Sequence, residues 1–319
     1  MRVYSEIKRL QTYLASRRLF DNWISFLLRY VLAKYGISVK LVARTGSCIY
    51  EISPKVFRML IDGVSRNVIK SIKCADGRLL ISGIGIETID ISELPVNPKS
   101  GMRVLGAVYD QGCRCWVVRK GARFRDIYGP IIETFFVGEY SAVNVANNVV
   151  IDVGAFVGDT AVYFAFKGAR KVIAVEPHPD AYAEMLENIG LNRLESVIVP
   201  VNAGLASKPG MLCVADTDVR NTTSVYHGIG DCRSSIPAMT LGELLDKFGL
   251  RGDIVLKMDC EGCERDVILN DYEHVSLFDE LIFEYHSSPD ELIMALSRDY
   301  RCMVTGSSSL GIAYCMRRR

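Results

Sequence analysis

Residues 149–159 read Val-Val-Ile-Asp-Val-Gly-Ala-Phe-Val-Gly-Asp, an apolar run that ends in a glycine-bearing loop. The pattern predicts a strand, a tight turn and the start of a helix, an arrangement that can hold a nucleotide-like ligand. A dinucleotide site requires G-x-G-x-x-G, whose middle glycine lets the chain approach a pyrophosphate. Phe156 stands at that middle position, and the spacing from Gly154 to Gly158 is G-x-x-x-G. The loop therefore favours a single adenosyl group with an amino-acid tail over a diphosphate.

A second strand, predicted over 171–175, ends at Glu176-Pro177. In doubly wound sheets an acid at this position accepts hydrogen bonds from ribose hydroxyls. The order strand, glycine loop, helix, strand and acid therefore supports a nucleoside site. The alternative is an ordinary βαβ unit, in which Asp159 caps the helix and Glu176 lies on the surface.

The composition of the whole chain excludes some functions. It has 319 residues and a net charge of +1, with 38 basic and 37 acidic side chains, so we expect no nucleic-acid partner. No apolar run is long enough to span a membrane and no signal peptide is evident, which predicts a cytoplasmic protein. Residues 1–36 form a predicted basic, amphipathic helix that either packs on the body or makes peripheral contact with a membrane surface.

Ten cysteines are present, and most stand in apolar, strand-like runs. We expect them to behave as small hydrophobic residues of a reducing compartment. The close pairs are Cys113 with Cys115 and Cys260 with Cys263. Because the chain has only four histidines, a zinc site is not expected.

The hydrophobic pattern divides the chain into residues 1–130 and 131–319. The first part reads as a helix followed by a small α+β region, with strands predicted at 39–42, 48–52, 79–81 and 115–118. In the second part strands alternate with helices, which predicts an α/β fold with a parallel sheet covered on both faces. Its strands are expected at 149–153, 171–175, 196–201, 212–214, 253–258 and 281–285, and its helices at 180–189, 241–248, 264–269 and 289–297. Thr240 and Glu243 have the spacing of a capping box, and the last two strands, at 300–304 and 312–316, should form an antiparallel hairpin.

Polar residues gather where the predicted strands end. Besides Asp152 and Glu176, these are the run Lys-Met-Asp-Cys-Glu-Gly-Cys-Glu at 257–264 and the run Glu-Tyr-His at 284–286. Ligands of open parallel sheets bind beyond the carboxyl ends of the strands. We therefore expect the functional site at this edge, with the polar loop 216–235 either covering the ligand or forming a solvated turn.

The motifs Asp-Val-Gly-Ala-x-x-Gly-Asp, Glu-Pro and Lys-x-Asp-x-Glu-Gly-x-Glu resemble those of the FkbM family of S-adenosylmethionine-dependent methyltransferases. The resemblance extends from about 133 to 286 and does not cover the N-terminal region. It implies a class I methyltransferase fold, Rossmann-like, with a seven-stranded, mostly parallel sheet, and methyl transfer to a hydroxyl oxygen. By the same resemblance Asp152, Gly154 and Gly158 hold the methionine part of the cofactor, Glu176 its ribose and Asn202 its adenine. Cys260 and Cys263 stand where the family has aliphatic or small residues, which leaves a redox role open.

Methyl transfer requires alignment of the acceptor and removal of its proton. His286 is one candidate base, because its ordinary pKa suits proton transfer, and the alternative is a histidine that caps the next helix. Asp259 and Glu261 are the other candidates, as a base, as an acceptor-binding pair or as ligands of Mg²⁺. On an extended strand they would share one side with Lys257, which could instead neutralise Asp259 in a buried ion pair.

Several functions remain open from the sequence. The first is O-methylation of a small molecule, a sugar or a glycan precursor. A nicotinamide-dependent oxidoreductase is disfavoured by Phe156, and RNA methylation is disfavoured by the neutral charge. A non-catalytic module of the same fold could use the basic N-terminus to dock on a membrane or a partner.

Overall fold

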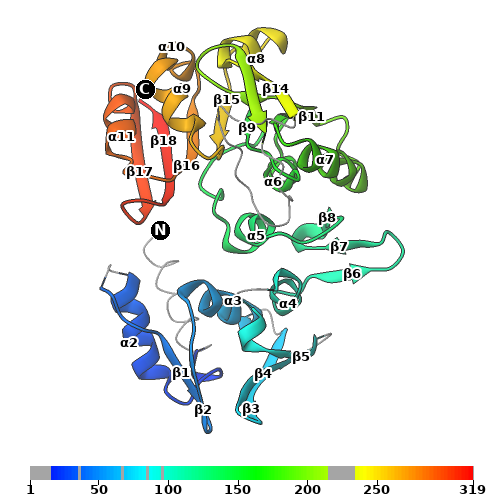
Figure 1. The fold of residues 1–319 in the computed structure, drawn as a ribbon, viewed down its shortest axis with the longest axis vertical. Coiled ribbons are helices and arrows are strands. Elements are labelled where there is room, and N and C mark those ends of the chain that lie inside the picture. Colours follow the sequence, from blue (N-terminus) through cyan, green and yellow to red (C-terminus); the bar gives the residue numbers. More distant parts are fainter. Residues whose placement is uncertain are drawn as a thin grey trace. The chain divides into compact units, whose positions relative to one another are not determined.

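The computed structural model divides into two compact units (Figure 1). The first comprises Met1–Gly121 and Asp126–Ile132, and the second comprises Ala122–Arg125 and Glu133–Arg319. Within them the structure describes residues 16–34, 37–65, 68–83, 86–94, 97–214 and 234–318. The first fifteen residues of the expected N-terminal helix, and residues 216–233 of the expected polar loop, lie outside the described residues.

A seven-stranded sheet forms the centre of the second unit, in the order β11-β10-β9-β15-β16-β18-β17. The five strands from β11 to β16 run parallel to their neighbours, and β18 is antiparallel to both β16 and β17. This order confirms the predicted class I, mostly parallel sheet with an antiparallel C-terminal hairpin. The strands are β9 (Val149–Val153), β10 (Lys171–Val175), β11 (Ile198–Val201), β15 (Ile254–Met258), β16 (Glu280–Tyr285), β17 (Tyr300–Gly306) and β18 (Gly311–Arg317).

The expected strand at 212–214 belongs to a different sheet. It forms part of β13 (Gly210–Val214), which pairs with β14 (Ser234–Met239), and β14 also pairs with β12 (Gly204–Leu205). The sequence predicted this strand without assigning it to a sheet, because alternation alone cannot tell which sheet a short strand joins.

Helices cover both faces of the large sheet. Ile151 on one face packs in a buried cluster with α8, α9 and α11, while its neighbour Val150 on the opposite face is also fully buried. The predicted capping box at the start of α8 is confirmed by reciprocal bonds between Thr240 and Glu243. The helical segments of this unit are the π-helical turn Glu133–Val137, α6 (Asp159–Phe166), α7 (Pro179–Asn192), α8 (Leu241–Lys247), α9 (Cys263–Asn270), α10 (Tyr272–Val275) and α11 (Asp290–Leu296), and the short strand β8 (Arg123–Phe124) lies beside α7.

The first unit is an α+β body with its own core around Phe26, Phe57 and Leu60. Where only short strands were expected, the structure has the twelve-residue helix α3 (Pro54–Ser65). Its buried residues Val56, Phe57, Leu60 and Val64 follow helical spacing. The other elements are α2 (Trp23–Lys34), β1 (Val42–Thr45), β2 (Cys48–Glu51), β3 (Ile69–Ala75), β4 (Arg78–Gly83), β5 (Ile86–Asp90), α4 (Pro98–Val104), β6 (Val108–Asp110), β7 (Cys115–Val117), α5 (Gly129–Ile132) and the 3-10 turns Ile91–Glu93 and Arg119–Gly121.

The cysteines correct the expectation of free thiols, because no described cysteine is free. Cys302 and Cys315 face each other across β17 and β18, in the register that the hairpin sets. Sequence alone could not pair residues that only the fold brings together. Such disulfide content is typical of oxidising compartments and weighs against the cytoplasmic expectation. The described pairs are Cys48–Cys74, Cys113–Cys115, Cys260–Cys263 and Cys302–Cys315.

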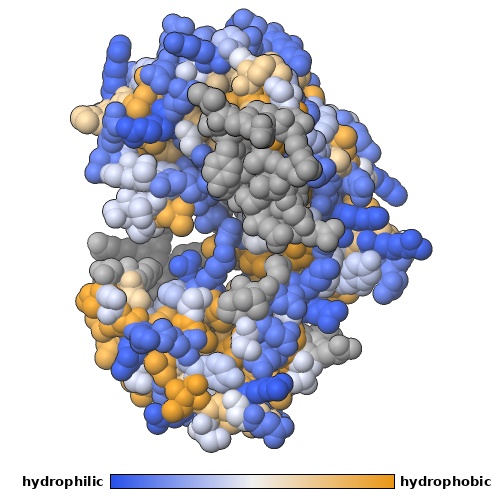
Figure 2. Space-filling view, in the orientation of Figure 1, coloured by the Kyte–Doolittle hydropathy of each residue, from blue (hydrophilic) through white to orange (hydrophobic). Residues whose placement is uncertain are grey.

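Helix α2 carries the apolar run of the N-terminal region. Phe26 and Leu27 are buried, whereas Ile24 and Leu28 are 67% and 63% exposed. Apolar side chains gather over this part of the first unit in Figure 2. Within the described ranges, every helix is too short or too polar to pass through a lipid bilayer. Peripheral membrane contact through residues 1–36 stays a prediction.

Candidate active site

Gly154 places the loop after β9 directly against the end of β15. It has a φ of +69°, and a Cβ built on it would lie 1.7 Å from the backbone oxygen of Asp259. Gly158, the N-cap of α6, has a φ of +84°, and its Cβ would meet Met185 at 2.9 Å. Both predicted glycines are therefore required by the backbone, because side chains at these dihedrals are strained and would clash.

Asp152 and Lys257 form a fully buried ion pair beneath this loop. Their side chains are 0% and 1% exposed, and the Lys257 Nζ lies 3.0 Å from the Asp152 carboxylate. Thr160 also donates to Asp152, and Lys257 donates to the carbonyl of Gly154 at 2.8 Å. The alternative that Lys257 pairs with Asp259 is wrong, because parallel pairing places Lys257 beside Asp152 in the register of β15 and β9. Asp152 thus supports the glycine loop from below.

Glu176 lies at the end of β10 with 4% exposure. It accepts hydrogen bonds from the backbone N–H groups of Phe156 and His178, both at 2.7 Å. Burial raises the pKa of Glu176 to about 7 against the opposing effect of these bonds. Asn202 donates to the backbone carbonyls of Glu176 and Pro177. The strand-end acid and the expected adenine-contacting residue are therefore brought together.

The start of α6 is poorly suited to a diphosphate. Phe156 adopts a left-handed φ of +49°, and its N–H is directed to Glu176. Asp159 occupies the first turn of the helix, almost completely buried, and accepts a hydrogen bond from Thr134 at 2.7 Å. Burial raises the pKa of Asp159 to about 7. A carboxyl group already stands where a pyrophosphate would need free N–H groups, which disfavours a dinucleotide.

A small apolar cavity opens beside the glycine loop. It has a volume of about 20 Å³ and is lined by residues from β9, β12, β13, α9 and the segments that follow β9, β10 and β15, namely Val153, Gly154, Pro177, Gly204, Leu205, Leu212, Cys260 and Cys263. Leu212 packs closely against Gly204. A Cβ built on this glycine would lie only 2.0 Å from the Cδ1 of Leu212. The lining is apolar, as the face of an adenine requires, but the volume is that of about one water. This cavity is therefore too small to hold a nucleoside.

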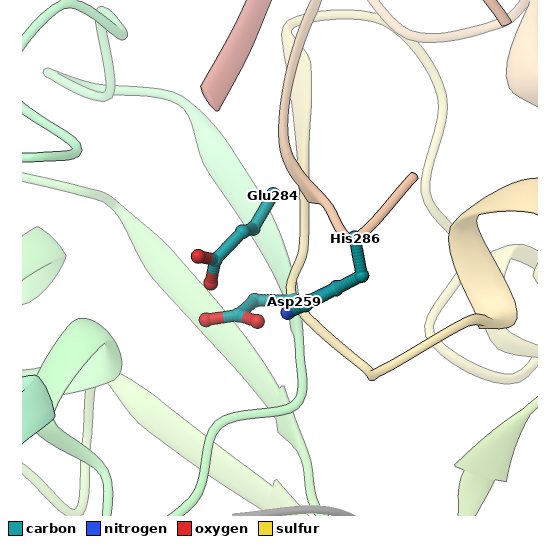
Figure 3. Close-up of side chains that lie close together, drawn as sticks. All are labelled: Asp259, Glu284 and His286. Atoms are coloured by element: carbon teal, nitrogen blue, oxygen red, sulfur yellow. The ribbon is translucent and has the colours of Figure 1, made fainter. Parts of the chain in front are cut away.

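Asp259, Glu284 and His286 converge where β15 and β16 end (Figure 3). Their carboxylate and imidazole atoms lie within 4.8 Å of one another. Tyr140 donates its hydroxyl to Asp259 at 2.8 Å. Burial, and next the charge of Asp259, raise the pKa of Glu284 to about 9. These groups form a carboxylate-rich cluster that could accept hydrogen bonds from hydroxyls or hold a divalent cation.

Glu261 lies beside this cluster in a tight turn. Its carboxylate is 3.2 Å from the Nε2 of His286. The strand β15 ends at Met258, as predicted, and Glu261 lies beyond it with a φ of +58°, so the alternation of an extended strand does not apply to this residue. Ligand atoms for Mg²⁺ were expected from Asp259 and Glu261, whereas the residues at this site whose ligand atoms lie within 4.8 Å of one another are Asp259, Glu284 and His286.

Comparison with known proteins identifies this half of the chain. Residues 152–302 match the family model described as the methyltransferase FkbM domain. Residues 152–302 form an FkbM methyltransferase domain. The match includes the glycine loop, Glu176 and the cluster at Asp259, and it confirms the resemblance drawn from the motifs.

Several solved structures are similar to the chain. The methyltransferase FkbM of Methylobacillus flagellatus KT has a TM-score of 0.42 and 16% identity, over 58% of this chain and 47% of that one. The ribosomal protein L11 methylase of Lactobacillus delbrueckii subsp. bulgaricus has a TM-score of 0.37 and 14% identity, over 57% and 76%. A protein from Streptococcus mutans, solved in complex with SAH, has a TM-score of 0.36 and 10% identity, over 60% and 100%. No curated protein matches the sequence.

Two residues at the Asp259 cluster were given no role by the sequence, although Glu284 belongs to the polar run 284–286 that was expected at this edge. Glu284 is in β16 and His286 follows the end of that strand, and their ligand atoms lie within 4.8 Å of each other. The position of both residues in one polar run was a usable signal. Tyr140 donates to Asp259 across 119 residues of sequence, and no local sequence pattern predicts this contact.

The buried carboxyls of the FkbM domain predict a pH dependence of stability. Asp159 and Glu176 hold protons to about pH 7 and Glu284 to about pH 9, whereas the ordinary pKa values are 3.8 for Asp and 4.5 for Glu. Between these limits the folded state binds more protons than the unfolded state, so stability falls as pH rises. We expect the thermal midpoint to decrease from about pH 5 to pH 9.

The variant Glu284→Gln isolates the contribution of Glu284 to this pH dependence of stability. It removes the group with the highest pKa, so the decline above about pH 7 should become shallower than in the wild type. Differential scanning calorimetry across the pH range measures both slopes. Identical slopes above pH 7 would contradict the raised pKa of Glu284.

Proposed function

We propose that the FkbM domain transfers a methyl group from S-adenosylmethionine to a hydroxyl oxygen of a small molecule, a sugar or a glycan precursor. The observation that carries this proposal is the position of the Asp259 cluster. Its backbone touches Gly154 of the predicted cofactor loop, while its carboxylate faces Glu284 and His286. Cofactor loop and proton-accepting groups therefore meet at one edge of the sheet.

The residues at the strand ends fit this cofactor. Gly154 and Gly158 would admit its methionine part, and Glu176, an acceptor at the end of β10, would hold the ribose hydroxyls. Asn202 lies at the same edge, where the adenine is expected. When bound, S-adenosylmethionine supplies an electrophilic methyl group on a sulfonium. The buried pair of Asp152 and Lys257 keeps the loop in place from below.

The cluster would position the acceptor and remove its proton. Asp259 would accept the proton of the acceptor hydroxyl as its oxygen takes the methyl group, whose bond to the sulfonium sulfur breaks and leaves the electron pair on sulfur. Tyr140 holds Asp259 by a hydrogen bond, and the Glu284 carboxyl, kept protonated by its raised pKa, faces the same group. His286, paired with Glu261, is the second base within reach. A placed base contributes roughly 10²–10⁴-fold to such a reaction.

Transfer of a labelled methyl group tests the proposal. The intact protein is incubated with S-adenosylmethionine labelled in the methyl group and an extract of its source cells, and the products are separated by size and class. We expect label in a small molecule or glycan as an ether, which resists mild alkali. Label in RNA or protein, an alkali-labile ester, or no label at all would overturn the proposed activity.

A further inference from the structure

The loop between β15 and α9 is closed by a disulfide in the sequence Cys-Glu-Gly-Cys. The Cys260–Cys263 bond encloses Glu261 and Gly262. C-x-x-C is the spacing of redox-active cysteine pairs. Among the described disulfides, this one alone has that spacing, since the others have sequence separations of 26, 2 and 13.

The loop closed by this disulfide contacts two parts of the candidate active site. Glu261, held at a φ of +58°, contacts His286. The two cysteines line the cavity beside Gly154, and a Cβ on that glycine would lie 3.4 Å from the Cα of Cys260. Any change in this loop therefore reaches both the acceptor cluster and the predicted cofactor loop.

Exposure makes the bond accessible from one side. Cys260 is partly exposed and Gly262 is exposed, whereas Cys263 is 2% exposed and forms the first residue of α9. A thiolate from solvent can therefore approach Cys260, with Cys263 as the leaving group. The helix N-terminus favours a departing thiolate, although the neighbouring Glu264, which accepts from the N–H groups of Cys260 and Gly262, opposes it.

We propose that Cys260 and Cys263 form a redox modification site, reduced by a dithiol, whose state sets the affinity of the cofactor site. The effect on affinity rests on the proposed function. The first thiolate of the dithiol attacks Cys260 Sγ, which breaks the protein disulfide and releases the Cys263 thiolate. The second thiolate of the dithiol then attacks the reductant's own sulfur in the mixed disulfide, which breaks the bond to Cys260 Sγ and releases the reductant as an internal disulfide. Two electrons and two protons pass from the dithiol to the two cysteines.

Opening the loop removes a constraint on four residues. The chain entropy that closure of so short a loop removes corresponds to a factor of roughly 10 to 30 in the equilibrium constant for ordering the loop. Because the loop packs against Gly154, binding must order it again in the reduced protein. We therefore expect reduction to weaken binding of S-adenosylhomocysteine, used as a non-reactive probe, by up to this factor.

The experiment poises the intact protein in dithiothreitol buffers of graded potential. Free thiols are trapped with N-ethylmaleimide and located by peptide mass spectrometry, and S-adenosylhomocysteine is titrated into each sample by calorimetry. We expect Cys260 and Cys263 to open before Cys302 and Cys315, with affinity falling as they open. The variant C260S/C263S should bind weakly at every potential, and the control C113S/C115S should respond like the wild type.

Two results would overturn the redox site. One is opening of Cys260 and Cys263 together with or after Cys302 and Cys315. The other is reduction of Cys260 and Cys263 while S-adenosylhomocysteine binds with a measurable affinity that does not change. If the pair opens first but the probe binds in neither state, the proposed cofactor is rejected and the selective redox chemistry stands.

Discussion

Replacing Lys257 with methionine is expected to lower the free energy of unfolding by about 3–5 kcal/mol. Lys257 and Asp152 are both excluded from water, and they lie 3.0 Å apart. Removing the cation leaves the Asp152 carboxylate buried without its charge partner. Methionine has a similar length and adds no polar group, so the loss reflects the unpaired charge rather than a cavity.

Urea unfolding followed by circular dichroism measures this effect. The control is Lys40→Met, because Lys40 forms an exposed ion pair with Glu51 at 2.9 Å, and such pairs contribute about 0–1 kcal/mol. The double variant D152N/K257M removes both charges and should recover part of the loss. A loss below about 1 kcal/mol for Lys257→Met would show that the pair does not support the glycine loop.

Replacing Asp259 with asparagine is expected to reduce kcat by roughly 10²–10⁴-fold, the contribution of a placed general base. Asparagine keeps the size of the side chain but accepts no proton. The backbone oxygen of Asp259, which faces Gly154, is unchanged. Binding of the cofactor should therefore be preserved while methyl transfer is lost.

The rate of transfer of the labelled methyl group measures this loss, and calorimetry with S-adenosylhomocysteine checks that the site remains formed. Asp246→Asn is the matched control, because Asp246 pairs with Arg251 on the exposed surface of α8. A reduction of less than about 10-fold would remove Asp259 from the role of base. His286, which lies within 4.8 Å of it, would then be the remaining candidate.

The sequence predicted the parts of the fold that depend on local pattern. The run at 149–159, followed by a strand and Glu176, was sufficient to predict β9, the glycine turn, the start of α6 and β10, because each of these leaves a signature within a few residues. The antiparallel hairpin at the C-terminus was found for the same reason. The boundaries of α7, α8 and α9 differ from expectation by at most three residues.

Features set by long-range pairing could not be predicted. Lys257 pairs with Asp152 because β15 lies beside β9, which the linear order of strands does not reveal. Tyr140 reaches Asp259 from a distant segment, and Cys302 meets Cys315 only through the register of a hairpin. Helix α3 was missed because the short apolar runs around it resemble strands as much as helix.

Calorimetric titration with S-adenosylmethionine and, separately, NADH tests the central claim most directly. The claim is that the turn at Phe156 and Asp159 accepts a single sulfonium nucleoside and rejects a dinucleotide. We predict saturable binding of S-adenosylmethionine, weakened in Gly154→Ala, and no binding of NADH. Binding of NADH without binding of S-adenosylmethionine would contradict the account.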